Sequence, residues 1–339
     1  MSTRSSKTER VLLSFVFALT ALFALTLLFG IPYSTPDQKP VLSGTETQIS
    51  DHSWLLSALS MLPGSRTRAV APFAVMIENH TGARPHHAGL EDALFISEYQ
   101  VEGGITRFSV LFDAKRLPTS IGPVRSLRPY FLDSAAPYTS LMLFAGGSPE
   151  ALEQVGSIGG LSFMNGLAYP QYFHRDPTIS EPHNLFTGKQ DITAILRKYS
   201  LKSISWPPFV TGTPSVSTPA TEISLNFFSS DHNVTYTYGS LGGTYRRQNG
   251  DETSKAHPAN ILILESPIRS IGEKGRLEID MTGQGKALLF QSGTVQEGTW
   301  KKDALVDPFV FEGENGPLLF ARGQTWMTVM PSMERVKWK

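Results

Sequence analysis

An uncharged run of 21 residues near the N-terminus, VLLSFVFALTALFALTLLFGI (residues 11–31), constrains this chain more than any other feature. A helix of that length crosses the roughly 30 Å hydrocarbon core of a bilayer. Three basic residues precede the run, whereas the charges of Asp37 and Lys39 after it cancel. The positive-inside bias therefore predicts a cytoplasmic N-terminus and extracytoplasmic main domains, as in a single-pass cell-membrane protein. The alternative is a cleaved signal peptide, but the run is longer than a typical signal core and lacks a clear A-x-A site, so we favour an uncleaved anchor.

Composition excludes several classes of function. Lysine plus arginine and aspartate plus glutamate number 30 each, so the chain lacks the positive excess of a general nucleic-acid binder. The absence of cysteine excludes disulfides, thiolate metal sites, thiol catalysis and a lipidated cysteine. A phosphate-binding Walker loop and a dinucleotide fingerprint are also missing, so we predict no cofactor.

The pattern of apolar runs predicts two extracytoplasmic domains of different class. Strand-like runs alternate with helix-like segments in the first domain, which indicates an α/β fold, whereas short β-rich runs between Gly and Asn turns predict an all-β sandwich or barrel in the second. A stretch rich in Pro, Thr and Ser separates them and is typical of a linker. The expected organisation is a cytoplasmic tail (1–10), a transmembrane anchor (11–31), a juxtamembrane segment (32–70), the α/β domain (71–205), the linker (206–220) and the β-rich domain (221–339).

A short apolar segment, Trp54–Leu62, interrupts the polar juxtamembrane region. Its spacing is compatible with a small amphipathic helix. Such a helix would lie near the membrane or against the first domain.

Two arginines three residues apart, Arg125 and Arg128, stand in the stretch IGPVRSLRPYF (residues 121–131). If Pro129 takes the first helical position, the free N–H groups of that helix and both guanidinium groups form a receptor for phosphate or carboxylate. The competing interpretation is that the arginines only tie loops to the sheet, and spacing alone slightly favours it. Their acidic partners would then be Glu98, Glu102 or Asp133.

Signals for catalysis and for metal binding are weak. Ser148 precedes a helix and offers a second anion site, but its G-G-S-P context is not a nucleophile elbow. The histidines lack the spacing of a metal motif, so we predict no metal. His183 and Asn184 form either a loop-fixing or a ligand-binding pair, with a general-base role open to His183. The candidates for catalysis are therefore Glu98, Glu102 and His183.

Several loop motifs together resemble the YerB family of bacterial extracytoplasmic proteins, often lipoproteins, built from two consecutive domains of unknown function. The motifs are PFAVMIEN, EGGITRF, IGPVRSLRPYF, AGGSPEAL, PHNLFT, ANILIL, GTW and GQTWMTVMP, in that order between about Pro72 and Pro331. The resemblance implies location and architecture but no reaction, and the missing lipidated cysteine is a departure that leaves anchoring to residues 11–31. The positions that match the family's recurring residues are Glu102, Gly103, Gly104, Arg107, Gly122, Arg125, Arg128, Gly147, Ser148, His183 and Asn184.

The resemblance shifts the balance toward an anion site, because recurring polar loop residues more often bind ligands than serve packing. We therefore expect a membrane-anchored envelope protein that binds an anionic cell-wall glycan or lipid-phosphate head group. Two alternatives remain: an envelope glycan or lipid-phosphate hydrolase or transferase, and a non-catalytic scaffold that recruits wall-synthesis enzymes. The ligand-binding residues expected are Arg107, Arg125, Arg128, Ser148, His183 and Asn184.

Overall fold

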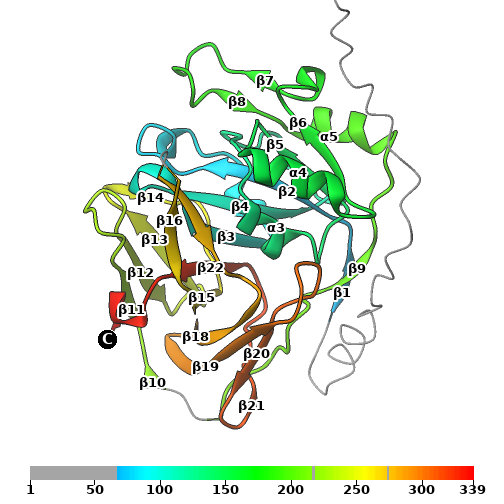
Figure 1. Cartoon of the computed structure of the whole chain (residues 1–339). Helices are drawn as coiled ribbons and strands as arrows, with labels where there is room; N and C mark the ends of the chain where they lie inside the picture. The colour runs from blue at the N-terminus through cyan, green and yellow to red at the C-terminus, as the bar shows by residue number, and fades with distance from the viewer. Residues whose placement is uncertain (1–66, 216–217, 273–274) are drawn as a thin grey trace, which may run out of the picture. The chain divides into compact units, whose positions relative to one another are not determined.

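The computed structural model describes residues 67–339 apart from residues 216–217 and 273–274 (Figure 1). The predicted tail (1–10) and anchor (11–31), and nearly all of the juxtamembrane segment (32–70), lie outside the described residues. Among the helices that are described, none is long and apolar enough to cross a bilayer.

A twelve-stranded mixed sheet joins the two halves of the described chain. At its middle, β3 pairs in parallel with β22, which comes from near the C-terminus, with Phe95 opposite Thr325. The sheet is therefore continuous across the two segments that the sequence predicts as separate domains. The strands in spatial order are β21 (Gly316–Pro317), β20 (Val310–Gly313), β19 (Thr294–Lys302), β18 (Gly283–Gln291), β15 (Asn260–Glu265), β22 (Thr325–Met330), β3 (Phe95–Gln100), β4 (Thr106–Asp113), β2 (Pro72–Glu78), β5 (Leu141–Phe144) and β6 (Ser162–Asn165), with β10 (Thr218–Pro219) beside β19.

Both faces of the large sheet are covered. Along β2, Phe73, Val75 and Ile77 enter one apolar core, whereas Ala74 and Met76 enter the other, as the alternation of a strand requires. A five-stranded antiparallel sheet contributes to the first core, and its strands are β14 (Glu252–Thr253), β13 (Thr244–Asn249), β12 (Val234–Gly239), β11 (Glu222–Leu225) and β23 (Val336–Trp338). Helices α3 (Pro129–Ala135) and α4 (Pro149–Ser157) pack into the second core (Figure 1).

The remaining elements are short. Helix α5 (Lys189–Leu196) adds Ile192 and Ile195 to the first core. Three two-stranded ribbons pair β1 (Arg68–Val70) with β9 (Ile204–Trp206), β7 (His174–Arg175) with β8 (Leu185–Phe186), and β16 (Ile268–Ile271) with β17 (Arg276–Ile279). The 3₁₀ helices are η1 (Arg84–His86), η2 (Leu90–Asp92), η3 (Glu102–Gly104), η4 (Pro170–Tyr172) and η5 (Met333–Arg335).

The mostly β architecture fits the predicted two-domain organisation, although strands of the second segment join the sheet of the first and do not form a separate sandwich or barrel. The α-helices of the described residues all lie between Pro129 and Leu196, and the described residues after Ile204 form strands and one 3₁₀ helix. The expected linker (206–220) is not an exposed tether, because Trp206, Phe209 and Val210 are buried. Its Pro/Thr/Ser composition indicates only that regular structure is absent, and this is true of a packed loop as well as of an exposed linker.

A buried ion pair links the two sheets. Glu98 on β3 is fully buried and accepts two hydrogen bonds from Arg247 on β13, at 2.8 and 2.9 Å. Trp326 on β22 and Thr106 on β4 also donate to this carboxylate, at 2.9 and 2.7 Å. Burial alone would lower the pKa of Arg247, but the charge of Glu98 together with the interactions of Tyr236 and the hydrogen bonds to Glu98 outweighs it, and the pKa is raised. Such a pair tolerates burial only because both partners and their hydrogen bonds are present.

We predict that Arg247→Ala lowers the free energy of unfolding by about 3–5 kcal/mol, because it leaves Glu98 charged and buried without its counter-ion. The neighbouring Arg246 is exposed and is a matched control, so Arg246→Ala should change the free energy by no more than about 0.5 kcal/mol. Urea unfolding of both variants measures this. Similar small effects for the two would show that the pair contributes little.

Candidate functional site

The candidate site lies where two parallel strands, β2 and β5, end. The segment 121–128 inserts between their carboxyl ends, since the Arg125 N–H donates to Met76 O at 2.9 Å on one side and the Ala145 N–H donates to Arg125 O at 3.0 Å on the other. A Cβ on Gly122 would lie 2.7 Å from the Phe186 ring, so the start of this segment requires glycine. In α/β sheets the region beyond the carboxyl ends of parallel strands is where ligands usually bind.

Arg107, Arg125 and Arg128 form an arginine cluster at this place. Arg107 on β4 stands directly opposite Glu78 on β2, and its Nη1 donates to Ser126 O at 2.8 Å. Burial and the charges of Arg128 and Arg125 lower the pKa of Arg107 to about 10. Arg125 and Arg128 therefore lie near enough to Arg107 to repel it electrostatically.

Arg128 is fully engaged within the protein. Its Nε and Nη2 donate to the two oxygens of Glu102 at 2.7 and 2.8 Å, and its Nη1 donates to Leu127 O. Burial alone would raise the pKa of Glu102, but the hydrogen bonds from Arg128 lower it. The pair therefore stabilises the fold above the ordinary Glu range and loses this effect as pH falls through the lowered pKa. Arg128 thus follows the competing salt-bridge interpretation, and Glu102 is a poor proton acceptor.

The buried carboxylate of Glu78 lies between a guanidinium and an imidazole. Its Oε1 is 3.2 Å from Arg125 Nε, and its Oε2 is 2.9 Å from His183 Nδ1. The side chain of Glu78 is 2% exposed, whereas those of Arg125 and His183 are 28% and 18% exposed and can be reached from solvent. A carboxylate at Nδ1 fixes the ring orientation and directs the chemistry of His183 to Nε2.

Two neighbours hold the imidazole of His183 in place. The ring of His80 stacks on it with centroids 5.1 Å apart and planes 10° apart. On its edge, a Cβ placed on Gly82 would lie only 3.0 Å from His183 Nε2. Gly82 therefore leaves room for the ring, and any larger residue there would press on it.

Two predicted ligand residues have local structural partners instead. Ser148 is the N-cap of α4, where its Oγ accepts a hydrogen bond from the Ala151 N–H. Asn184 is buried, and its Oδ1 accepts from Arg175 Nη1 at 2.5 Å. Both roles fix loops, which is the alternative that the sequence left open for Asn184.

Glu98 is removed from the catalytic candidates by its surroundings. It is fully buried and its oxygens accept the four hydrogen bonds from Arg247, Thr106 and Trp326 described above. Proton transfer to a ligand needs a carboxylate within reach of that ligand. The sequence could not reveal this, because Arg247 is 149 residues away.

Sequence reasoning missed Glu78 and Gly82. Glu78 does carry a signal: it is a charged residue that ends the apolar strand PFAVMIE, and all seven positions of that strand are buried. Gly82 carries none, because its role depends on a histidine that is distant in the sequence. Within the described residues, no group of three or more His, Asp or Glu side chains is arranged to hold a metal ion.

Comparisons with known proteins agree on the chain's relatives. The N-terminal domain of the family described as "Protein of unknown function (DUF3048)" matches residues 60–202, and the C-terminal domain of that family matches residues 223–327. The chain is 32% identical over 277 residues to "Putative lipoprotein YerB" of Bacillus subtilis (strain 168), covering 78% of this chain and 82% of the relative. The crystal structure of the YerB protein from Bacillus subtilis matches with a TM-score of 0.72 at 30% identity, over 80% of this chain and 94% of that one. The lipoprotein description is consistent with a membrane-associated, extracytoplasmic location.

We predict that Gly82→Ala displaces the imidazole of His183 and breaks its hydrogen bond to Glu78, which lowers the free energy of unfolding by about 1–3 kcal/mol. Gly159→Ala is the matched control, because a Cβ there meets no atom within 4 Å. Chemical denaturation compares the two, and ¹⁵N NMR of the His183 ring reports the lost contact. An unchanged ring resonance in Gly82→Ala would contradict the assignment.

Proposed function

Since the chain belongs to the YerB-like family built from DUF3048 N-terminal and C-terminal domains, we propose that it binds an anionic, phosphate- or carboxylate-bearing envelope ligand through Arg107, Arg125 and His183. We further propose that it is a single-pass membrane protein anchored by residues 11–31, with the described part outside the cell. The anchor takes the place of a lipidated cysteine, which this chain lacks.

The excess of positive charge in the arginine cluster carries the proposal. Three guanidinium groups face two carboxylates, Glu78 and Glu102, so one positive charge is left over. The Nε–H group of Arg107 is buried and makes no hydrogen bond to any described residue, whereas the buried Nε of Arg125 lies 3.2 Å from Glu78 Oε1 in an ion pair. Buried donors without acceptors are costly and rare in proteins, and an anion would satisfy them.

The three residues would contribute differently to the bound anion. Arg125 is the most exposed and would make the direct charge-assisted contact. Arg107 is nearly buried and would contribute positive electrostatic potential and one hydrogen-bond donor. His183, held by Glu78, would offer its Nε2 at the rim of the site. Arg128 is left out of this set, because Glu102 already occupies it.

Binding of a simple anion tests the proposal. Titration of the protein with inorganic phosphate, and retention of the protein on isolated cell wall, should both weaken about tenfold or more in Arg125→Ala, because a charge-assisted hydrogen bond contributes about 1.5–3 kcal/mol. Arg197→Ala, at an exposed arginine of α5's C-cap, is the control and should bind normally. Equal binding by both variants, with unchanged melting temperatures, would contradict the anion site.

A second candidate function is acid–base catalysis on the same ligand, and the Glu78–His183 pair favours it. A buried carboxylate on Nδ1 is the arrangement that makes Nε2 a proton acceptor in many hydrolases and transferases. Glu78 and His183 would take the roles that the sequence gave to Glu98, Glu102 and His183. Incubation with isolated wall polymers and lipid-linked precursors, followed by mass spectrometry, should show products that His183→Gln abolishes, whereas phosphate binding should weaken only in part because Arg107 and Arg125 remain. Identical product profiles for the unaltered protein and His183→Gln would contradict catalysis, and only the binding function would remain.

A further inference from the structure

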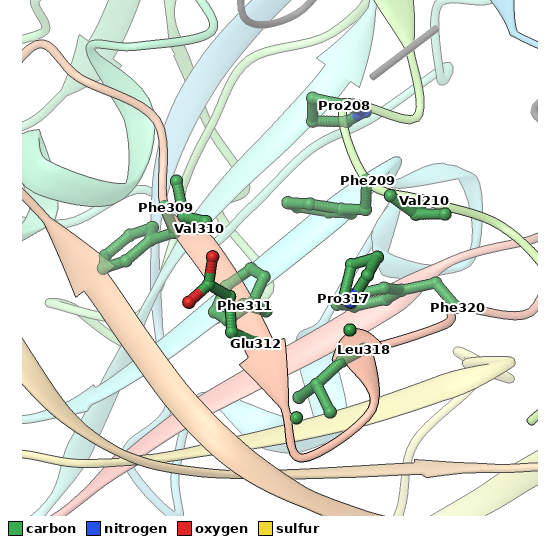
Figure 2. Close-up of a pocket in the computed structure, with 12 residues that line it drawn as sticks. Pro208, Phe209, Val210, Phe309, Val310, Phe311, Glu312, Pro317, Leu318 and Phe320 are labelled. Atoms are coloured by element: carbon green, nitrogen blue, oxygen red, sulfur yellow. The ribbon is translucent and has the colours of Figure 1, made fainter. Parts of the chain in front are cut away.

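A groove lined by aromatic residues lies at the edge of the large sheet. Its residues come from other segments of the chain than the arginine cluster. Its volume is about 370 Å³, and it is bounded by the β20–β21 hairpin and by the chain that follows β9. Figure 2 shows phenylalanine rings from both segments facing a common space, with the carboxylate of Glu312 beside them. The residues of this aromatic groove are Pro208, Phe209, Val210, Phe309, Val310, Phe311, Glu312, Gly313, Gly316, Pro317, Leu318 and Phe320.

The floor of the groove is rigid and apolar. Phe209 stacks on Phe320 with ring centroids 4.6 Å apart and packs edge-on against Phe311 at 5.6 Å. These rings are nearly buried, whereas Glu312 and Pro317 at the rim are exposed. A preformed apolar floor with a polar rim fits an amphipathic segment.

The N-terminal end of the described chain leads to this groove. β1 and β9 pair antiparallel, with Arg68 opposite Trp206 and Val70 opposite Ile204. The chain that enters β1 therefore comes from the side toward which β9 leaves, and β9 continues directly into Pro208 and Phe209 of the groove.

The sequence just before β1 has the chemistry that the groove needs. Residues 54–62, WLLSALSML, carry no charge, and at helical spacing Trp54, Leu55, Ala58, Leu59 and Leu62 share one face while the two serines lie on the other. A nine-residue helix is marginal in water unless its apolar face is buried. Five residues lie between Leu62 and Arg68, and these six steps of extended chain span up to roughly 20 Å.

We infer that the segment 54–62 of this chain docks in the aromatic groove, with its Leu/Trp face on the phenylalanine floor. Because the segment is tethered next to the groove, docking is intramolecular and needs little intrinsic affinity, since short tethers give effective concentrations on the order of millimolar. With the anchor at residues 11–31, docking would hold the extracytoplasmic part close to the bilayer surface. This inference is independent of the anion site.

Cysteine cross-linking of the full-length chain in detergent or nanodiscs tests the docking directly, because the natural sequence contains no cysteine. The pair Leu59→Cys with Val310→Cys should form a disulfide readily under mild oxidation. Two control pairs should form several-fold less: Ser60→Cys with Val310→Cys probes the opposite face, and Leu59→Cys with Leu241→Cys probes an exposed turn outside the groove. Equal yields for all three pairs would overturn the inference, because they would indicate random collisions.

A second measurement needs no cross-link and guards against misfolded variants. Leu55→Asp with Leu59→Asp should release the segment and increase binding of a hydrophobic dye to the groove several-fold, whereas Ser57→Asp with Ser60→Asp adds the same charge on the other face and should not. Dye binding that is equal in both double variants would contradict docking. Docking would also be contradicted if the segment 54–62 resisted proteolysis only when anionic vesicles were present, because the membrane would then be its partner.

Discussion

The buried pair of Glu98 and Arg247 is the interaction on which the rest of the structure depends. It connects β3 of the large sheet to β13 of the small one, and the guanidinium also lies 4.3 Å above the ring of Trp326 on β22. Asn79, next to Glu78, donates to Thr106 and to Asn249 of the small sheet, so the polar network reaches the end of β2. The same strand end therefore carries a structural network on one face and the candidate site on the other. A charged pair in this position favours one register between the sheets, because any other would bury an unpaired charge.

Below the arginine cluster, which carries a small excess of positive charge, the backbone is held in a fixed position. Glu78 and Arg107 face each other across β2 and β4, and the segment 121–128 is pinned by backbone hydrogen bonds on both sides. Because the Arg107 side chain and the backbone at Arg125 are already held in place, the proposed anion binding would cost less conformational entropy. Glu102 neutralises Arg128 and so limits the mutual repulsion within the cluster. Three guanidinium groups and two carboxylates leave the cluster with an excess of one positive charge, on which the proposed anion binding rests.

The sequence predicted local structure well and tertiary partners poorly. Ser148 was expected to precede a helix, and it is the N-cap of α4 (Pro149–Ser157). The apolar run PFAVMIE likewise became β2. The parallel pairing of β3 with β22 could not be predicted, since periodicity shows that a strand exists but not which strand lies beside it. For the site, the arginine positions were foreseen and their partners were not: Arg128 pairs with Glu102, one of the carboxylates considered, whereas Arg125 lies beside Glu78, which was not. The burial of Arg247 was detectable in principle, because Tyr245, Arg247 and Asn249 alternate onto the buried face of β13.

The central claim is that the guanidinium groups of Arg107 and Arg125 together bind an anion. The most direct measurement is ¹H–¹⁵N NMR of the arginine Nε–H resonances during titration with inorganic phosphate. The account predicts that the resonances of Arg107 and Arg125 shift together and saturate, while that of Arg128, held by Glu102, moves little. Resonances of Arg107 and Arg125 that do not respond to phosphate, or that move no more than those of exposed arginines elsewhere, would contradict it.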